Sequence, residues 1–250
     1  MKLTAKYPLL GALLAPFIFT ACATAHEGPP PETEDSVHAY ILLDRTGSMQ
    51  SIWDEALGSV NAYAGGLSDA ENDGPDLDPK ISLAVFDAQD GLQFDVLRGG
   101  VEASDWNELT NDEASPRGMT PLFDAIGRIV SLAEQDAPEK AVLVIMTDGQ
   151  ENASREMDKA AAKAALDRAR AREWEVVFLG AEFANFDDAD AVGVSGAKSM
   201  AVSRDKMGET MERLSKKTRD YATGAEQSVV FDEEDRAIAE EDEVKQRTGQ

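Results

Sequence analysis

The sequence predicts an α/β domain over residues 37–222, with a mostly parallel, doubly wound sheet between two layers of helices and one antiparallel edge strand. From residue 37 onward, short apolar runs alternate with longer segments of helical periodicity, the order expected of parallel strands joined by crossover helices. The runs 37–43 and 141–146 are continuously apolar, as in strands covered on both faces. A polar turn at 87–91 separates two further short runs and predicts a hairpin, hence the antiparallel edge.

Local signals define the individual elements. Strands are predicted at residues 37–43, 80–86, 92–97, 141–146, 175–179 and 198–202. Helices are predicted at residues 51–67, 121–135, 154–173 and 203–221. The first helix ends near Gly65-Gly66, the second has Pro121 at its start, where the missing N–H costs nothing, and the third is rich in alanine. The polar stretch 111–118 is predicted to be a loop.

The N-terminus has the pattern of an export signal. Lys2 and Lys6 flank the start of an apolar stretch at 7–20 that ends in small residues. This stretch is shorter than the roughly 20 residues that a spanning helix needs. Phe19-Thr20-Ala21-Cys22 resembles a bacterial lipoprotein signal, in which the cysteine becomes the lipidated first residue, so we expect a signal peptide at 1–21 and lipidation of Cys22. Ordinary secretion, with cleavage after residues 23–25, is the alternative.

Two polar segments flank the predicted domain. Residues 22–36 include a proline-rich, acidic stretch without apolar periodicity, and we expect them to form a tether. Residues 223–250 include the acidic blocks 232–235 and 240–243, and we expect this tail to be disordered or a frayed helix. Capture of a basic partner by the tail is a second interpretation of the same charge.

Charge, histidine content and cysteine content exclude several classes of function. Lys and Arg number 24 against 48 Asp and Glu, which gives a net charge of -24. No nucleic acid partner is therefore expected, and no direct adsorption to an anionic membrane. The acidity suits a divalent cation or a basic protein, and it also explains solubility by itself. His26 and His38 are the only histidines, which predicts neither a zinc site nor a Ser-His-Asp arrangement. Cys22 is the only cysteine, so no intrachain disulfide can form.

Oxygen-bearing side chains follow two of the predicted strands. Asp44, Thr46 and Ser48 come directly after the first strand, and Asp148 follows the fourth. Thr120 stands in the loop before the second helix. Hard cations such as Mg²⁺ select oxygen ligands of this kind. Because doubly wound sheets bind ligands outside the carboxyl ends of their strands, these five side chains converge if the first and fourth strands are neighbours.

These motifs resemble the metal-ion-dependent adhesion site of von Willebrand factor type A (VWA) domains, and the resemblance spans about residues 37–221. That family's pattern is Asp-x-Ser-x-Ser, then a Thr in a distant loop, then an Asp after the central strand. Asp44-Arg45-Thr46-Gly47-Ser48 departs from it once, with Thr for the first Ser, which keeps a hydroxyl oxygen. Gly118-Met119-Thr120-Pro121-Leu122 and Thr147-Asp148-Gly149 match the other two segments. The resemblance implies the three-layer, Rossmann-like VWA fold.

The resemblance also implies a binding module that is not an enzyme. Ser48, Thr46 and Thr120 would touch a Mg²⁺ ion, or Mn²⁺ or Ca²⁺, directly or nearly so, while Asp44 and Asp148 would act through waters. One coordination position would stay open for an Asp or Glu carboxylate of a protein partner. Together with the export signal, this places a lipoprotein, anchored only by its lipid, on the exterior side of a bacterial membrane, facing the periplasm or the cell surface. Without lipidation the protein would be secreted or periplasmic.

Two other functions are left open by the sequence. The segment from Asp44 to Ser48 also resembles the Asp-Lys-Thr-Gly-Thr phosphorylation motif of haloacid-dehalogenase-like (HAD-like) phosphatases, in which Asp44 would be a nucleophile. Arg45 in place of Lys and Thr46 in place of the second Asp count against this function. The other is a structural envelope protein whose metal only stabilises the loop cluster.

Overall fold

A six-stranded sheet forms the centre of the fold. The computed structural model describes residues 37–68, 77–182 and 186–249. The strands are β1 (Val37–Asp44), β2 (Lys80–Ala88), β3 (Leu92–Glu102), β4 (Lys140–Thr147), β5 (Glu175–Ala181) and β6 (Ser199–Val202). They lie in the order β3-β2-β1-β4-β5-β6; β2 and β3 pair antiparallel, and the other neighbours pair parallel. The predicted mostly parallel sheet with an antiparallel edge strand is confirmed.

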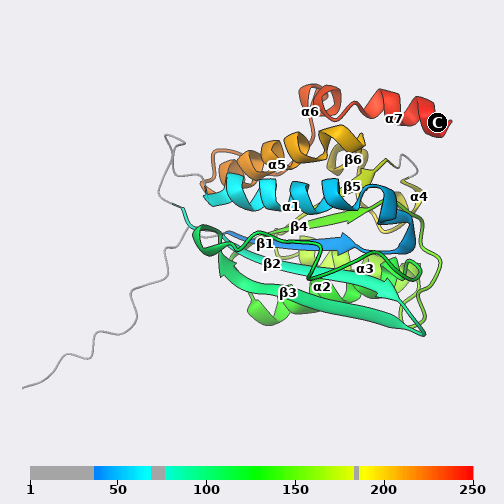
Figure 1. Cartoon of the computed structure of the whole chain (residues 1–250). Coiled ribbons are helices and arrows are strands. Elements are labelled where there is room, and N and C mark those ends of the chain that lie inside the picture. Colours follow the sequence, from blue (N-terminus) through cyan, green and yellow to red (C-terminus); the bar gives the residue numbers. More distant parts are fainter. Residues whose placement is uncertain (1–36, 69–76, 183–185, 250) are drawn as a thin grey trace, which may run out of the picture. The chain divides into compact units, whose positions relative to one another are not determined.

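Helices cover both faces of this sheet (Figure 1). The α-helices are α1 (Trp53–Ser68), α2 (Leu122–Asp136), α3 (Lys159–Arg170), α4 (Asp187–Ala191), α5 (Met207–Ala222), α6 (Glu233–Ile238) and α7 (Glu241–Thr248). Short 3-10 helices lie at Gly47–Ser51, Ala103–Asp105, Gly196–Lys198 and Arg204–Lys206. α1 and α5 pack against each other on one face, and α2 and α3 pack against each other on the opposite face. The result is the expected three-layer arrangement.

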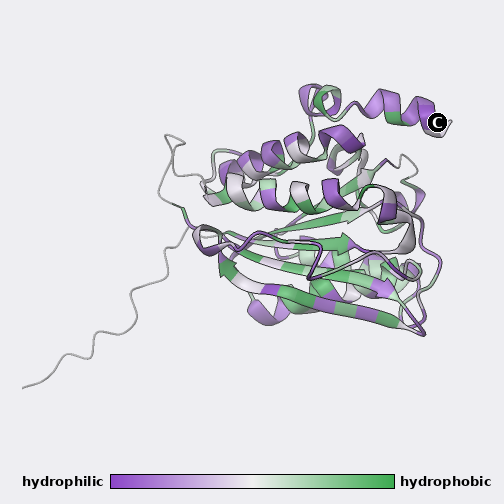
Figure 2. Ribbon diagram, in the orientation of Figure 1, coloured by the Kyte–Doolittle hydropathy of each residue, from purple (hydrophilic) through white to green (hydrophobic). Residues whose placement is uncertain are grey.

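The side chains of strand β1 contribute to the hydrophobic core on both faces of the sheet. Ala39, Ile41 and Leu43 belong to the core cluster that includes α1 and α5, while Tyr40 and Leu42 belong to the cluster that includes α2 and α3. Every residue of β1 is buried, because side chains alternate between faces and each face is covered by helices. Figure 2 shows the strands of the sheet as largely hydrophobic, whereas the helices also carry hydrophilic residues. The continuous apolar run that predicted this strand is thus a consequence of double coverage.

The third predicted helix, 154–173, is shorter in the structure, where α3 runs from Lys159 to Arg170. The N–H groups of residues 155–157 donate to the Asp124 carboxylate on α2, at distances between 2.6 and 3.0 Å. The helix begins only after Asp158, whose side chain accepts an N–H from the first turn. Alanine content therefore predicted the helix, but a tertiary contact determines where it starts.

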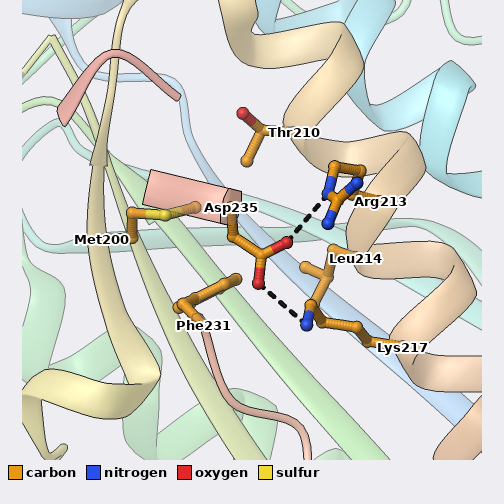
Figure 3. Close-up of a pocket in the computed structure, with 7 residues that line it drawn as sticks. All are labelled: Met200, Thr210, Arg213, Leu214, Lys217, Phe231 and Asp235. Atoms are coloured by element: carbon orange, nitrogen blue, oxygen red, sulfur yellow. Dashed lines mark hydrogen bonds and ion pairs between the residues drawn. The ribbon is translucent and has the colours of Figure 1, made fainter. Parts of the chain in front are cut away.

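The C-terminal tail corrects the expectation of disorder, because residues 229–248 include α6 and α7 and pack onto α5 and β6. Asp235 is only 3% exposed and forms ion pairs with two basic residues of α5 (Figure 3). Arg213 Nε lies 2.9 Å from Asp235 Oδ1, and Lys217 Nζ lies 2.8 Å from Asp235 Oδ2. Phe231 is buried beside these ion pairs, and Val244 of α7 is buried against Ala201 of β6. Acidic composition predicted disorder or a frayed helix, but Arg213 and Lys217 on α5 form ion pairs with Asp235, and buried apolar side chains also attach the tail.

The same tail covers the outer edge of β6. The Ala201 N–H donates to the Glu241 carboxylate at 3.2 Å, and the Ser203 N–H donates to the Ala239 carbonyl at 2.9 Å. Arg236 donates to the Ser199 carbonyl at 3.3 Å. Backbone groups of an edge strand that would otherwise be open to another strand are in this way satisfied within the chain.

The predicted signal peptide at 1–21, the tether at 22–36 and Cys22 lie outside the described residues. Within the parts that the structure describes, no helix is long and apolar enough to cross a membrane.

A buried polar network lies at the start of β1, at the opposite end of the strand from Asp44. Tyr40 donates its hydroxyl to Asp136 at 3.0 Å, so His38 Nδ1, 2.9 Å from that hydroxyl, must be the donor to Tyr40. His38 Nε2 then accepts the Ser82 hydroxyl at 2.9 Å, and Ser82 Oγ in turn accepts the Gly100 N–H. Asp136 is hydrogen-bonded to Tyr40 and not to His38, so the network is not a Ser-His-Asp arrangement, and Ser82 is only 1% exposed.

This network predicts a loss of stability in acid. Burial lowers the pKa of His38 to about 4, from 6.5 in the unfolded chain. Above pH 6.5 both states are neutral and the contribution is complete; as pH falls from 6.5 to 4 the unfolded state alone gains a proton, so up to about 3 kcal/mol is lost. In urea unfolding across this window, the difference in free energy of unfolding between wild type and His38→Gln should show that slope, because groups that titrate in both proteins cancel in the difference. An unchanged slope in the variant would assign the acid sensitivity to other groups.

Candidate metal centre

The parallel pairing of β1 with β4 creates the site. Leu43 on β1 faces Met146 on β4 in the register of this pair, so Asp44 and Asp148 leave the sheet at neighbouring positions. β1 also pairs with β2 on its other side, and the strand order therefore changes direction between β1 and β4. Doubly wound sheets bind ligands at this switch point, outside the carboxyl ends of the strands. The neighbouring first and fourth strands that the sequence argument required are present.

Three hydroxyls and two carboxylates form one connected cluster there. Thr46 Oγ1 lies 3.1 Å from Ser48 Oγ, and Thr120 Oγ1 donates to Thr46 Oγ1 at 3.4 Å. Ser48 Oγ donates to Asp148 Oδ1 at 2.7 Å. Asp44 Oδ1 accepts the Thr46 N–H at 2.7 Å. The structure thus brings together all five side chains that the sequence singled out.

The cluster is buried at its base and open at its mouth. Asp44, Thr46 and Thr120 are 0%, 1% and 3% exposed, whereas Ser48 is exposed and Asp148 is partly exposed. Gly149 lies at the same mouth, where a Cβ would stand 3.6 Å from both Ser48 Oγ and Thr120 Oγ1. The absence of a side chain at Gly149 keeps the space beside these two hydroxyls free. A ligand can therefore approach the oxygens from one side only.

Electrostatics favour a cation at this place. Burial raises the pKa of Asp44 to about 7, against hydrogen bonds from Thr147 and Thr46 that lower it, and the charge of Asp148 raises it further. Burial also raises the pKa of Asp148 above its ordinary value. A positive ion beside the two carboxylates would reverse both shifts.

The donor set fits a hard divalent cation. Every side-chain donor of the cluster is oxygen, the ligand type that Mg²⁺, Mn²⁺ and Ca²⁺ prefer. Among the described residues no group of three or more His, Cys, Asp and Glu side chains could hold a metal. At this cluster the hydroxyl oxygens are the further side-chain ligands beside the two carboxylates. Ser48, Thr46 and Thr120 are the residues placed to supply them, with Asp44 and Asp148 as the balancing charges.

Thr147, which the sequence argument missed, holds the central carboxylate. Its hydroxyl donates to Asp44 Oδ2 at 2.5 Å and its own side chain is fully buried. Both oxygens of Asp44 consequently accept hydrogen bonds within the protein. Burial and these two hydrogen bonds count against Asp44 as the nucleophile of the phosphatase alternative.

A buried ion pair anchors the loop that carries Thr120. Arg45 is 4% exposed and donates from Nε to Asp87 at 2.7 Å, and Arg117 donates to the other Asp87 oxygen at 3.2 Å. The Arg117 N–H also donates to the Arg45 carbonyl at 2.8 Å. Arg45 is therefore a buried structural residue, and Asp87, at the end of β2, holds both arginines. An Asp at the end of an apolar strand was the sequence signal for it.

Gly118 completes this anchor because its conformation is open to glycine alone. Its φ is +73°, and a Cβ would stand 2.4 Å from the Ala88 carbonyl oxygen and 3.0 Å from Asp87 Oδ2. The loop can therefore press closely against the end of β2, where Met119 and Ala88 exchange two backbone hydrogen bonds of 2.9 and 3.2 Å.

Met49 and Trp53, which directly follow the cluster, are not exposed. They are 0% and 4% exposed and belong to the core beneath α1. The Trp53 indole N–H donates to the Ala114 carbonyl at 3.2 Å. These side chains attach the first helix to the sheet and do not form an apolar rim for a partner.

No family model and no curated protein matches this sequence. Several solved structures are similar in fold, and three of them are described here. The pilus adhesin SpaC from Lactobacillus rhamnosus GG, in its open conformation, is 13% identical with a TM-score of 0.56, over 74% of this chain and 30% of that one. Proximal thread matrix protein 1 from the mussel byssus is 19% identical with a TM-score of 0.51, over 73% of this chain and 46% of that one.

Another similar structure is a protein described as von Willebrand factor type A. A von Willebrand factor type A protein from Catenulispora acidiphila is 14% identical with a TM-score of 0.50, over 74% of this chain and 42% of that one. The chain spans less than half the length of each of these three proteins. Identities this low establish the architecture and leave the function to be argued from the site. The chain has a von Willebrand factor type A-like fold.

Proposed function

We propose that this chain is a divalent-metal-dependent protein-binding module. The observation that carries the proposal is the convergence of Thr46, Ser48, Thr120, Asp44 and Asp148 into one oxygen cluster with an open mouth. Ser48, Thr46 and Thr120 would hold the ion, and the two carboxylates would balance its charge. Bound there, the metal supplies an electrophilic position that a partner's Asp or Glu carboxylate can occupy.

The residues of the site suit recognition better than catalysis. Asp44 and Thr46 are fully enclosed and engaged in hydrogen bonds with neighbours. Only the side at Ser48 and Asp148 faces solvent, so a partner can reach the ion without displacing the buried carboxylate. With few charged ligands, the ion keeps enough positive charge to attract an acidic group despite the acidity of the chain.

We further propose that the protein works outside the cytoplasm, held to a membrane by a lipid on Cys22. The N-terminal sequence supports this location through its basic start, apolar stretch and cysteine. The proline-rich residues up to 36 would hold the domain at a distance from the bilayer. The adhesin SpaC, with which the chain shares its fold, is consistent with a role in surface attachment.

Metal should stabilise the folded chain through Ser48. At a free Mg²⁺ concentration of 100 times the dissociation constant, binding adds about 2.7 kcal/mol to the free energy of unfolding, or roughly 5–10 °C in the melting temperature. Ser48→Ala should abolish this increase, whereas Ser51→Ala, at an exposed serine of the same 3-10 helix, should retain it. Thermal unfolding with Mg²⁺ and with EDTA measures both. Equal responses of the two variants would remove Ser48 from the metal site.

Capture of a protein partner should need the metal. Immobilised wild-type domain is expected to retain a specific protein from a bacterial envelope extract in Mg²⁺ and to release it in EDTA. Ser48→Ala should fail to retain that protein in either condition, while Ser51→Ala should behave as wild type. A partner retained in EDTA and by Ser48→Ala, together with a normal metal-induced rise in melting temperature for the wild type, would instead make the metal purely structural.

Lipidation of Cys22 should be visible directly. When the full chain is expressed in a bacterium supplied with labelled palmitate, the wild type should incorporate the label and Cys22→Ser should not. Absence of label in the exported wild type would support ordinary secretion and would contradict the membrane anchor.

A further inference from the structure

Asn152 joins the loop after β4 to the loop that carries Thr120. The Thr120 N–H donates to Asn152 Oδ1 at 2.9 Å, and the Asn152 N–H donates to the Thr120 carbonyl at 3.0 Å. Both backbone groups of Thr120 are therefore satisfied by this one residue. Asn152 lies on the segment that continues from Asp148, so the two hydrogen bonds connect one oxygen donor of the cluster to another.

The segment that carries Asn152 is itself firmly attached. The Glu151 carboxylate accepts the N–H groups of Ala153 and Ser154 at 2.9 and 2.7 Å, and it accepts the Phe123 N–H in the first turn of α2 at 3.0 Å. On the far side of Asn152, the buried Asp124 carboxylate accepts three further N–H groups of residues 155–157. Asn152 thus projects from a frame fixed to α2, which begins just after Thr120.

The side chain of Asn152 contributes little else. The residue is exposed, so its replacement removes no apolar packing. Loss of the side-chain oxygen would leave the Thr120 N–H without its acceptor inside a partly buried contact. The hydroxyl of Thr120 would then be held less tightly opposite Thr46 and Ser48, and metal affinity depends on how well such outer partners orient the donors.

We propose that Asn152 is a positioning residue that fixes the Thr120 hydroxyl relative to Asp148 for metal binding. This inference rests on the proposed metal-dependent function of the same cluster. It assigns a role to the Gln150-Glu151-Asn152 segment, whose part in the site was not foreseen from the sequence. It also explains why two loops far apart in the chain can present donors at fixed separations.

A matched control exists on α1. Asn61 Oδ1 accepts the Leu109 N–H at 2.8 Å, and Asn61 Nδ2 donates to the Leu109 carbonyl at 3.0 Å. Asn61 therefore holds a loop backbone through a comparable pair of hydrogen bonds, but it holds no residue of the oxygen cluster. Asn61→Ala reports the general cost of losing such a contact.

The experiment measures Mg²⁺ affinity by titration calorimetry and metal-free stability by urea unfolding in EDTA, for four proteins: wild type, Asn152→Ala, Asn152→Asp and Asn61→Ala. Asn152→Ala should bind Mg²⁺ about 10- to 100-fold more weakly. Asn61→Ala should bind within about threefold of wild type while losing at least as much metal-free stability. Asn152→Asp keeps an oxygen acceptor for the Thr120 N–H and should bind as tightly as wild type or more tightly.

The outcomes separate this inference from the function on which it rests. If wild type binds Mg²⁺ and Asn152→Ala binds equally well, or no worse than Asn61→Ala, Asn152 has no positioning role and the metal site stands without it. If Asn152→Asp fails to restore affinity, the acceptor oxygen is not the group that matters and the inference is again overturned. If wild type itself binds no divalent metal, the proposed function fails and the inference fails with it.

Discussion

The parallel pairing of β1 with β4 is the constraint on which the rest of the site depends. It sets the end of the first strand beside the end of the fourth, so that Asp44 and Asp148 emerge together. Thr147, which donates a hydrogen bond to Asp44, is 103 positions further along the chain. The pairing is stabilised by apolar side chains on both faces, which come from opposite layers of helices. A single substitution at the cluster would leave this pairing intact, because the core and not the cluster holds the strands together.

The loops around the paired ends of β1 and β4 are held in place by carboxylates. Asp87 binds both Arg45 and Arg117, and Asp124 accepts N–H groups of the segment before α3. Glu151 closes the turn that contains Asn152. Each of these acids is satisfied by defined donors within the domain. The acidity of the chain is therefore partly structural at the site, and the same holds at the C-terminus, where Asp235 and Glu241 secure the tail. Composition alone does not distinguish such acids from solvated ones.

The fold and the five oxygen donors could be predicted from sequence because each rests on a local pattern. Continuous apolar runs predict strands that helices cover on both faces. Hydroxyls and carboxylates directly after those runs predict a cluster of polar side chains at the switch point of the sheet. The same pattern marks Thr147 and Asp87 as polar residues after apolar runs, but it does not show what they hold, and it does not mark Asn152. The roles of all three consist of contacts with residues more than 30 positions away. The tail was misjudged for a similar reason, because the partners of Asp235 lie on another helix. The start predicted for α3 was likewise too early, because the hydrogen bonds from residues 155–157 to Asp124 could not be foreseen from the sequence.

The central claim is that these oxygens surround one divalent cation. A crystal structure of the domain with Mn²⁺, recorded at a wavelength that reveals the ion's anomalous scattering, tests it most directly. The account predicts one peak at the mouth of the cluster, within about 2.2 Å of the Ser48 hydroxyl and in contact with Thr46 and Thr120, as expected for a small hard cation. A peak elsewhere, or hydroxyls that still hydrogen-bond to one another with no ion between them at saturating Mn²⁺, would contradict it.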